Sequence, residues 1–317
     1  KKHFPVGEGL FARHKGMAVK AVDGVSLSVE EGETLGIVGE SGCGKSTLGR
    51  TLLRLIEPTG GEIYFQGKNL LALSQRELRD ARRQMQIIFQ DPYASLNPRM
   101  RVGDIVGEGL EIHKLAKGKA KRDRVIELLQ QVGLREDHYH RYPHEFSGGQ
   151  RQRIGIARAL AVSPKFIVCD EPVSSLDVSI QAQIINLLQE LQEKMHLTYF
   201  FISHDLRVVE HISHRVAIMY LGKIVEIAKS DTIYRDAKHP YTRALLSAVP
   251  VIDTRQKKER TVLQGDVPSP VHPPAGCSFH PRCLYREGIC DQQVPPLEFG
   301  PDGHGVACHV FGPAKQR

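Results

Sequence analysis

The sequence GESGCGKST at residues 39–47 directly follows the apolar run TLGIV at residues 34–38. From Gly39 to Ser46 it matches the pattern G-x-x-x-x-G-K-[ST], in which glycines let successive backbone N–H groups point at phosphate oxygens. The run before it is typical of a buried strand, and STLGRTLLRLI after the glycines has the apolar spacing of a helix. A strand, this loop and a helix in that order predict a phosphate-binding loop, because the helix N-terminus adds positive potential.

The side chains of this loop have separate expected roles toward the phosphates of a nucleotide. Lys45 has the length to reach the β- and γ-phosphates, and the Ser46 hydroxyl suits a Mg²⁺ ion. Because Cys43 lies among N–H groups and beside Lys45, we expect its thiol to favour the thiolate form. The residues expected to bind the phosphates are Gly39, Ser41, Gly42, Cys43, Gly44, Lys45, Ser46 and Thr47.

A second apolar run, FIVC at residues 166–169, ends in two acids. It predicts a buried strand that delivers Asp170 and Glu171 at its carboxyl end, the edge at which open α/β sheets bind ligands. We expect Asp170 to hold Mg²⁺, directly or through water, and Glu171 to accept a proton from an attacking water as a general base. Glu171 alone would equally suit a surface acid, but its position beside Asp170 favours the catalytic role.

The segment EFSGGQRQR at residues 145–153 predicts a second helix N-terminus with small residues. Ser147, Gly148 and Gly149 stand just before the helical run, which indicates a second phosphate site. Because the chain already has a full phosphate loop, two such ends predict a nucleotide shared between two subunits.

Buried strands alternate with helices along most of the chain, which predicts an α/β fold with a mainly parallel sheet. The helical stretch from about residue 91 to 163 interrupts this alternation and indicates an inserted helical subdomain. The composition changes after residue 250, where prolines and cysteines become frequent. We therefore expect a nucleotide-binding domain over residues 1–250 and a small C-terminal extension over residues 251–317.

Over about residues 19 to 230 the chain resembles the ATP-binding cassette ATPases, because its motifs occur in the order of that family. They are the loop at 39–46, Gln90, FSGGQ at 146–150, FIVCDE at 166–171, SSLD at 174–177 and SHD at 203–205. The resemblance implies an ATPase core that hydrolyses ATP with Mg²⁺. Phe146 stands where leucine is usual in the family, and because phenylalanine is also apolar we expect no loss of activity.

The resemblance also implies roles for residues that spacing alone does not assign. Gln90 would sense the nucleotide, help to hold Mg²⁺ and contact a permease, and His204 would lie near the γ-phosphate. Asp177 would lie in the loop between subunits, and the signature that touches the partner subunit's ATP would comprise Ser147, Gly148, Gly149 and Gln150. An aromatic side chain that stacks on adenine is expected upstream; we assign it to Phe4, with Phe11 as the alternative.

Further segments resemble the oligopeptide and dipeptide importers, closest to the F-type ATP-binding subunits of bacterial dipeptide permeases. They are FQDPYASLNPR at 89–99, HPYTRALLSAVP at 239–250, GDVPSPVHPPAGCSFHPRC at 265–283 and VACHV at 306–310. The implied partners are a second, homologous ATPase subunit, two transmembrane permease subunits and, indirectly, a periplasmic or extracellular peptide-binding protein. The implied location is peripheral, at the cytoplasmic face of a bacterial inner membrane. The nickel importers share much of this pattern, so the cargo stays open between peptides and a nickel complex.

Four of the six cysteines lie in the extension, at Cys277, Cys283, Cys290 and Cys308. Disulfides are not expected in a cytosolic protein, so the group suggests a metal. The C-x2-C or C-x4-C pairs usual in zinc ribbons are absent. Because some relatives bind a [4Fe–4S] cluster with cysteines of this region, we expect such a cluster, with zinc or unliganded thiols as alternatives.

The formal net charge of +7 and the basic run HKLAKGKAKRDR at residues 113–124 would also suit a nucleic-acid partner. We interpret the run as a solvated face. Nucleic-acid enzymes of this superfamily carry long coiled coils or zinc insertions, and this chain has no long heptad run and no CxxC pair. We therefore expect no nucleic-acid partner. A regulatory subunit that does not hydrolyse ATP is also disfavoured, because Glu171 and His204 are both intact.

Overall fold

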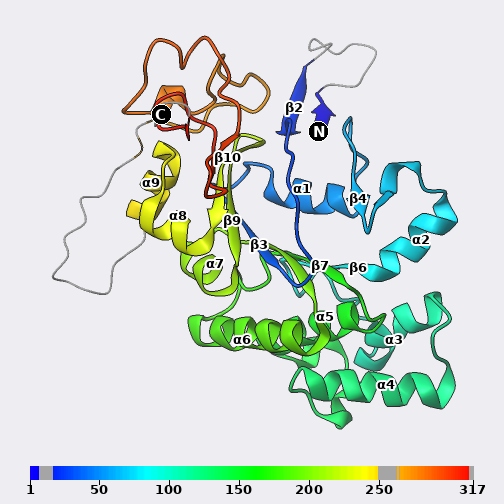
Figure 1. Cartoon of the computed structure of the whole chain (residues 1–317). Coiled ribbons are helices and arrows are strands. Elements are labelled where there is room, and N and C mark those ends of the chain that lie inside the picture. Colours follow the sequence, from blue (N-terminus) through cyan, green and yellow to red (C-terminus); the bar gives the residue numbers. More distant parts are fainter. Residues whose placement is uncertain (7–16, 249–262, 264, 314–317) are drawn as a thin grey trace. The chain divides into compact units, whose positions relative to one another are not determined.

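A computed structural model describes residues 1–6, 17–248, 263 and 265–313 of the 317-residue chain (Figure 1). The chain divides into two compact units. The first comprises Lys1–Ser28, Leu35–Gly61 and Ser203–Arg317, and the second comprises Val29–Thr34 and Glu62–Ile202. Two sequence-based predictions fall outside the described residues: Phe11 as the alternative adenine-stacking residue, and the domain boundary at residues 250 and 251.

In the first unit the main sheet has the strand order β11, β12, β10, β9, β3. β3 (Thr34–Val38) pairs in parallel with β9 (Arg215–Tyr220), which pairs antiparallel with β10 (Lys223–Lys229). β10 pairs antiparallel with β12 (Gly305–Val306), and β12 with β11 (Glu298–Phe299). Every residue of β3 is buried, as its continuous apolar sequence predicts. Because β11 and β12 come from the C-terminal extension, the extension is part of this sheet.

The remaining described elements of the first unit are a strand pair and a set of helices. β1 (Lys2–Pro5) and β2 (Ala18–Val22) form an antiparallel pair of their own. The helices are α1 (Lys45–Leu52), α7 (Leu206–Ile212), α8 (Ser230–Asp236), α9 (Pro240–Ser247) and the short 3-10 helix η4 (His280–Arg282). Among the residues that the structure describes, no helix combines the length and the apolar character that crossing a membrane requires.

The second unit contains a parallel sheet of β6 (Met85–Ile88), β7 (Phe166–Asp170) and β8 (Thr198–Ile202), paired in that order. All of β8 is buried, in agreement with its run of bulky apolar residues. The other elements are the hairpin β4 (Tyr64–Phe65) and β5 (Lys68–Asn69), the 3-10 helix η1 (Leu70–Ala72), α2 (Gln75–Gln84) and α6 (Val178–Met195).

A group of helices in the second unit lies within the range 91–163 that the sequence indicated as helical. They are α3 (Val102–Ile112), α4 (Gly118–Gln131), η2 (Glu136–His140), η3 (Pro143–Glu145) and α5 (Gly148–Leu160). Val125, Leu128 and Leu129 of α4 are fully buried, which gives this group an apolar core.

The basic run at residues 113–124 is only partly the solvated face that we expected. Lys117, Lys119 and Arg122 are exposed. Lys121 is buried against α3, where its Nζ lies 2.9 Å from Glu111 Oε1 and 3.8 Å from Asp104 Oδ1. One charge of the run therefore stabilises helix packing instead of facing solvent.

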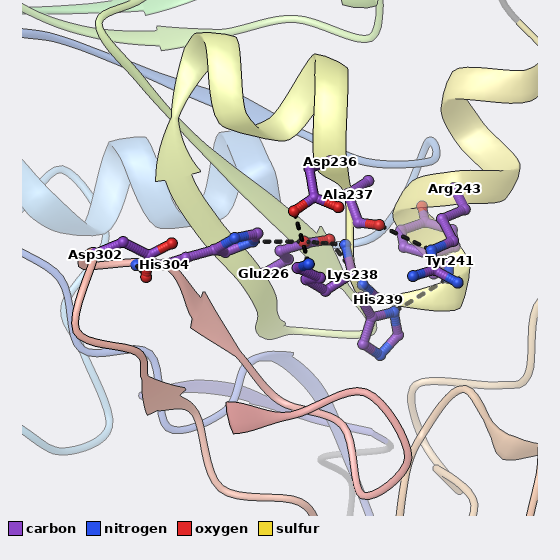
Figure 2. A network of polar contacts seen from close by, with 9 residues as sticks. All are labelled: Glu226, Asp236, Ala237, Lys238, His239, Tyr241, Arg243, Asp302 and His304. Atoms are coloured by element: carbon purple, nitrogen blue, oxygen red, sulfur yellow. Dashed lines mark hydrogen bonds and ion pairs between the residues drawn. The ribbon is translucent and has the colours of Figure 1, made fainter. Parts of the chain in front are cut away.

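A buried carboxylate on β10 joins the extension to the rest of the first unit, as Figure 2 shows. Glu226 is fully buried and accepts hydrogen bonds from the backbone N–H groups of Lys238 (2.6 Å) and His239 (3.1 Å). In the extension, His304 Nε2 lies 2.7 Å from Glu226 Oε1. Because an unpaired buried charge is strongly destabilising, these partners fix the position of His304 beside β10.

Burial lowers the pKa of His239 to about 4, although the Glu226 carboxylate acts to raise it. The folded protein keeps this imidazole neutral where an exposed histidine, with a pKa near 6.5, is protonated. Because the unfolded chain binds the proton first, the free energy of unfolding falls by roughly 3 kcal/mol as the pH drops from about 6.5 to about 4.

His239→Asn should lose this pH dependence while keeping a side chain that suits the start of α9. Urea unfolding at about pH 7 and about pH 5 measures the stability lost by each protein over the window. We expect a smaller loss for the variant than for the wild type. Equal losses would show that His239 does not take up a proton on unfolding.

Candidate functional site

The phosphate loop is shaped by two close approaches of its backbone to neighbouring strands. A side chain at Gly39 would place its Cβ 2.1 Å from the carbonyl oxygen of Met219 on β9. At Gly44, which has a φ of +108°, a Cβ would lie 1.9 Å from the carbonyl oxygen of Ala21 on β2. Only glycine fits either position, so the sequence pattern reflects contacts with β9 and β2 as well as the needs of a ligand.

Lys45 is buried at the start of α1, and its ammonium group lies inside the loop. Its Nζ donates to the carbonyl oxygens of Gly39 (2.8 Å) and Glu40 (3.2 Å). A phosphate oxygen carries a full negative charge and accepts a stronger hydrogen bond from an ammonium group than a neutral carbonyl does. The loop therefore holds Lys45 where a phosphate would take over its hydrogen bonds.

The expectation that Cys43 favours the thiolate form is wrong. Cys43 is buried, and burial raises the pKa of its thiol, while the nearby Lys45 only partly opposes this. Its backbone carbonyl accepts a hydrogen bond from the N–H of Gly222 (2.9 Å), so the residue faces the turn between β9 and β10. The loop is electropositive, but the cost of removing the thiolate from water is the larger effect.

Glu171 and Gln90, both in the second unit, lie in direct contact, which the sequence did not predict. β6 and β7 are parallel neighbours, so the chain leaves both strands at the same edge of the sheet. There the side-chain amide of Gln90 donates from Nε2 to Glu171 Oε2 (2.9 Å). Asp170, the last residue of β7, is buried. This edge of the sheet thus carries two carboxylates: that of Asp170, which is buried, and that of Glu171, which accepts a hydrogen bond from Gln90. Carboxylate oxygens are hard ligands of the kind that Mg²⁺ prefers.

The backbone of Glu171 adopts a conformation that non-glycine residues rarely take. Its φ is +47°, in the left-handed region. Its N–H donates to the carbonyl oxygen of Ile202 at the end of β8 (3.0 Å), and Ser174 Oγ donates to its carbonyl oxygen (3.1 Å). Such strain persists only where surrounding bonds impose it, and it concentrates at functional positions.

The segment SHD at residues 203–205 lies beside the strand that enters the phosphate loop. The N–H of Ser203 donates to the carbonyl oxygen of Ile37 on β3 (3.2 Å). Asp205 then caps α7 by accepting from the N–H of Arg207 (2.9 Å). His204, between them, is exposed. The first unit therefore contains both the loop and His204, while Asp170, Glu171 and Gln90 belong to the second.

The signature residues begin a helix, as the sequence predicted. Ser147 caps α5 in a reciprocal arrangement: its Oγ accepts from the N–H of Gln150 (3.3 Å), and Gln150 Oε1 accepts from the N–H of Ser147 (3.1 Å). Gly149 is packed so closely that a Cβ would lie 2.5 Å from Ile180 on α6. Phe146 is buried and packs edge-on against His138, with ring centroids 5.1 Å apart.

Two further predicted site residues lie at the surface of their units. Asp177 is exposed and precedes α6, the place expected of a residue that faces another subunit. Phe4 is partly exposed on β1, opposite Val19, and the Nζ of Lys2 lies 4.7 Å from the centre of its ring.

The predicted iron–sulfur cluster is wrong, and the zinc alternative has no support. All four cysteines of the extension are described, and nowhere in the described ranges do three or more His, Cys, Asp or Glu side chains form a group that could hold a metal ion. Burial raises the pKa of Cys277 to about 11 and also raises those of Cys283 and Cys308. The sulfurs of Cys290 and Cys308 instead accept backbone N–H groups, from Glu287 (3.5 Å) and Phe311 (3.4 Å).

Family descriptions match both parts of the chain. That of the ABC transporters matches residues 22–174, and that of the oligopeptide/dipeptide transporter C-terminal region matches residues 225–290. The oligopeptide transport ATP-binding protein AppF of Bacillus subtilis is 55% identical over 98% of this chain and 95% of its own length. The dipeptide transport ATP-binding protein DppF of Escherichia coli is 51% identical over 97% of this chain and 91% of its own.

Solved structures confirm the predicted α/β fold with a mainly parallel sheet. The dimeric structure of the ATP-binding cassette MJ0796 in a post-hydrolysis state, bound to ADP and Pi, aligns with a TM-score of 0.64 and 31% identity. The alignment covers 72% of this chain and 95% of the MJ0796 chain. CbiO1 of Clostridium perfringens, part of the ABC transporter complex cbiONQ, aligns with a TM-score of 0.61 and 27% identity, covering 68% and 84%.

The burial of Cys43 predicts slow reaction with thiol reagents. Because alkylation requires an exposed thiolate, we expect iodoacetamide to modify Cys43 at least about tenfold more slowly in the folded protein than in urea. Peptide mass spectrometry after timed labelling measures the rate at this residue alone. Equal rates in the folded and unfolded protein would contradict the burial described above.

Proposed function

The chain belongs to the ATP-binding cassette transporter family, in its oligopeptide and dipeptide branch, and we propose that it powers the uptake of short peptides by hydrolysing ATP. This family membership confirms the resemblance that the motifs indicated, including that to F-type subunits of dipeptide permeases. The observation that carries the proposal is the phosphate loop, with Lys45 folded inside it. Peptides, and not a nickel complex, are the cargo that the names of AppF and DppF support.

The phosphate loop is the proposed site for the β- and γ-phosphates of ATP. Its backbone N–H groups and the Lys45 ammonium supply the positive potential that phosphates require. The donors proposed for Mg²⁺ are the Ser46 hydroxyl, the Asp170 carboxylate and the Gln90 amide oxygen, all hard oxygens of the kind that Mg²⁺ prefers. Bound Mg²⁺ would offset the charge that the phosphates carry.

Glu171 is the proposed general base for the attacking water. Its carboxylate is oriented by the Gln90 amide and by a backbone conformation that its neighbours impose. An oriented carboxylate can accept the proton that the water loses as it attacks phosphorus. Gln90 acts as the residue that positions this base, and His204 is proposed to lie near the γ-phosphate.

The remaining site residues are proposed to contact the adenine base or the nucleotide of a partner subunit. Phe4 would stack on adenine through the face of its ring. The residues proposed to touch the nucleotide of a partner subunit are Ser147, Gly148, Gly149, Gln150 and Asp177. The capping of α5 by Ser147 and the exposure of Asp177 support this, because both lie at helix starts that a second chain can approach.

The protein is a peripheral subunit of a transporter complex with membrane permease partners. We further propose that it works at the cytoplasmic face, beside a second, homologous ATPase subunit and two permease subunits. A peptide-binding protein on the other side of the membrane would then deliver the cargo.

Glu171→Gln keeps the shape of the side chain but removes the base. We expect the reconstituted transporter to bind ATP normally and to hydrolyse it at least about a hundredfold more slowly, as loss of general-base assistance implies. Lys45→Ala should instead lose ATP binding. Phosphate release and equilibrium binding of Mg-ATP measure the two effects separately.

Glu193→Gln is the matched control, because Glu193 is an exposed acid on α6 that takes no part in the site. Its turnover should equal that of the wild type. Near-normal turnover in Glu171→Gln would remove Glu171 from the role of base.

A further inference from the structure

An ion pair between a buried arginine and a partly exposed glutamate links the C-terminal extension directly to the phosphate loop. Arg282, the last residue of η4, is buried, and Glu40 is the second residue of the loop. The two terminal nitrogens of Arg282 donate to the two carboxylate oxygens of Glu40, at 2.7 and 3.0 Å. This two-bond geometry is the strong form of an arginine–carboxylate contact. It joins residues that are 242 positions apart in the chain.

Glu40 is held at its backbone as well as at its carboxylate. Its N–H donates to the hydroxyl oxygen of Tyr241 on α9 (2.9 Å). Its carbonyl oxygen accepts from the N–H of Cys43 (3.2 Å) and from the Nζ of Lys45 (3.2 Å). One residue thus contacts the extension through its side chain and the phosphate-binding lysine through its backbone.

The partners of Glu40 rest on a rigid aromatic cluster. The rings of Tyr220, Tyr241 and Phe279 are all buried, with centroid separations of 4.7, 5.3 and 5.4 Å. Phe279 precedes Arg282 by one turn, so its packing fixes the start of η4. The contact with Glu40 holds the pKa of Arg282 above its ordinary value, which keeps the guanidinium charged.

Contacts other than this pair also attach the extension to the rest of the unit. β12 pairs with β10, the N–H of Ala307 donates to the carbonyl oxygen of Val225 (2.8 Å), and His304 contacts buried Glu226. These contacts lie on β10, away from the loop residues. The ion pair differs from these contacts because it reaches a residue of the phosphate loop itself.

We propose that Arg282 is a positioning residue for ATP: by binding Glu40, the C-terminal extension holds the phosphate loop in the conformation that accepts the triphosphate. The proposal rests on the function assigned above to residues 39–47. A loop that binds phosphate through backbone N–H groups must keep their directions fixed, and the glycines of this loop allow many others.

Arg282→Ala in the full-length chain tests the proposal by equilibrium binding of Mg-ATP. Losing a charge-assisted contact of this kind should raise the Kd, and the KM of the reconstituted transporter, by about tenfold. At saturating ATP the kcat should stay within about twofold of wild type, because the groups proposed for chemistry are unchanged. Arg282→Lys keeps the charge but not the paired geometry, so its Kd should lie between those of the wild type and Arg282→Ala.

The effect must pass through Glu40. Glu40→Gln, which keeps the shape of the side chain, should weaken ATP binding as Arg282→Ala does. The double variant should have a Kd no higher than that of the more weakly binding single variant, because both substitutions remove the same interaction. Arg286→Ala is the matched control, since Arg286 is an exposed arginine of the same extension. Its Kd should equal that of the wild type.

Wild-type affinity in Arg282→Ala would overturn the proposal. So would a loss of affinity that matches a loss of protease resistance in residues 265–313, since the pair would then serve only to hold the extension. Additive losses in the double variant would also reject it. If Lys45→Ala bound ATP like the wild type, the phosphate-loop assignment itself would fail, whatever Arg282→Ala showed.

Discussion

The backbone of the phosphate loop lies so close to its neighbours that no side chain fits at Gly39 or Gly44. Gly39 faces the carbonyl oxygen of Met219 on β9, and Gly44 faces that of Ala21 on β2. The loop therefore packs against β9, the strand that pairs with β10, and β10 in turn pairs with the extension. The position of Lys45, the burial of Cys43 and the reach of Arg282 to Glu40 all depend on this packing.

Much of the site could be predicted from the sequence, because its parts are local. The glycine spacing of residues 39–46 identified the loop, and the apolar run before Asp170 identified the strand that ends at Glu171. The contact between Gln90 and Glu171 was not predicted, although two parallel strands that end at one edge of the sheet explain it. The strained backbone of Glu171 was not predicted, since it depends on a hydrogen bond to Ile202, at the end of a different strand.

Other features depend on contacts that no local pattern records. The sequence shows that Cys43 lies beside Lys45, but not that the thiol is removed from water. The pairing of Arg282 with Glu40 spans 242 positions, and that of His304 with Glu226 spans 78, so neither has a spacing signal. The four cysteines suggested a metal because they cluster in one segment of a chain in which disulfides are not expected. The described residues of the extension are held instead by strand pairing, by the Phe279 cluster and by the contacts of Arg282 with Glu40 and of His304 with Glu226.

The extension therefore contacts the phosphate loop directly, and the proposed role of Arg282 would make it part of the ATP site. A structure of the full chain with Mg-ATP, within its transporter, examines this in one measurement. It should show the triphosphate in the loop at residues 39–47 with Arg282 still paired to Glu40. A triphosphate bound in that loop with Glu40 turned away from Arg282 would contradict the role of the extension. A nucleotide bound elsewhere would contradict the assignment of the loop.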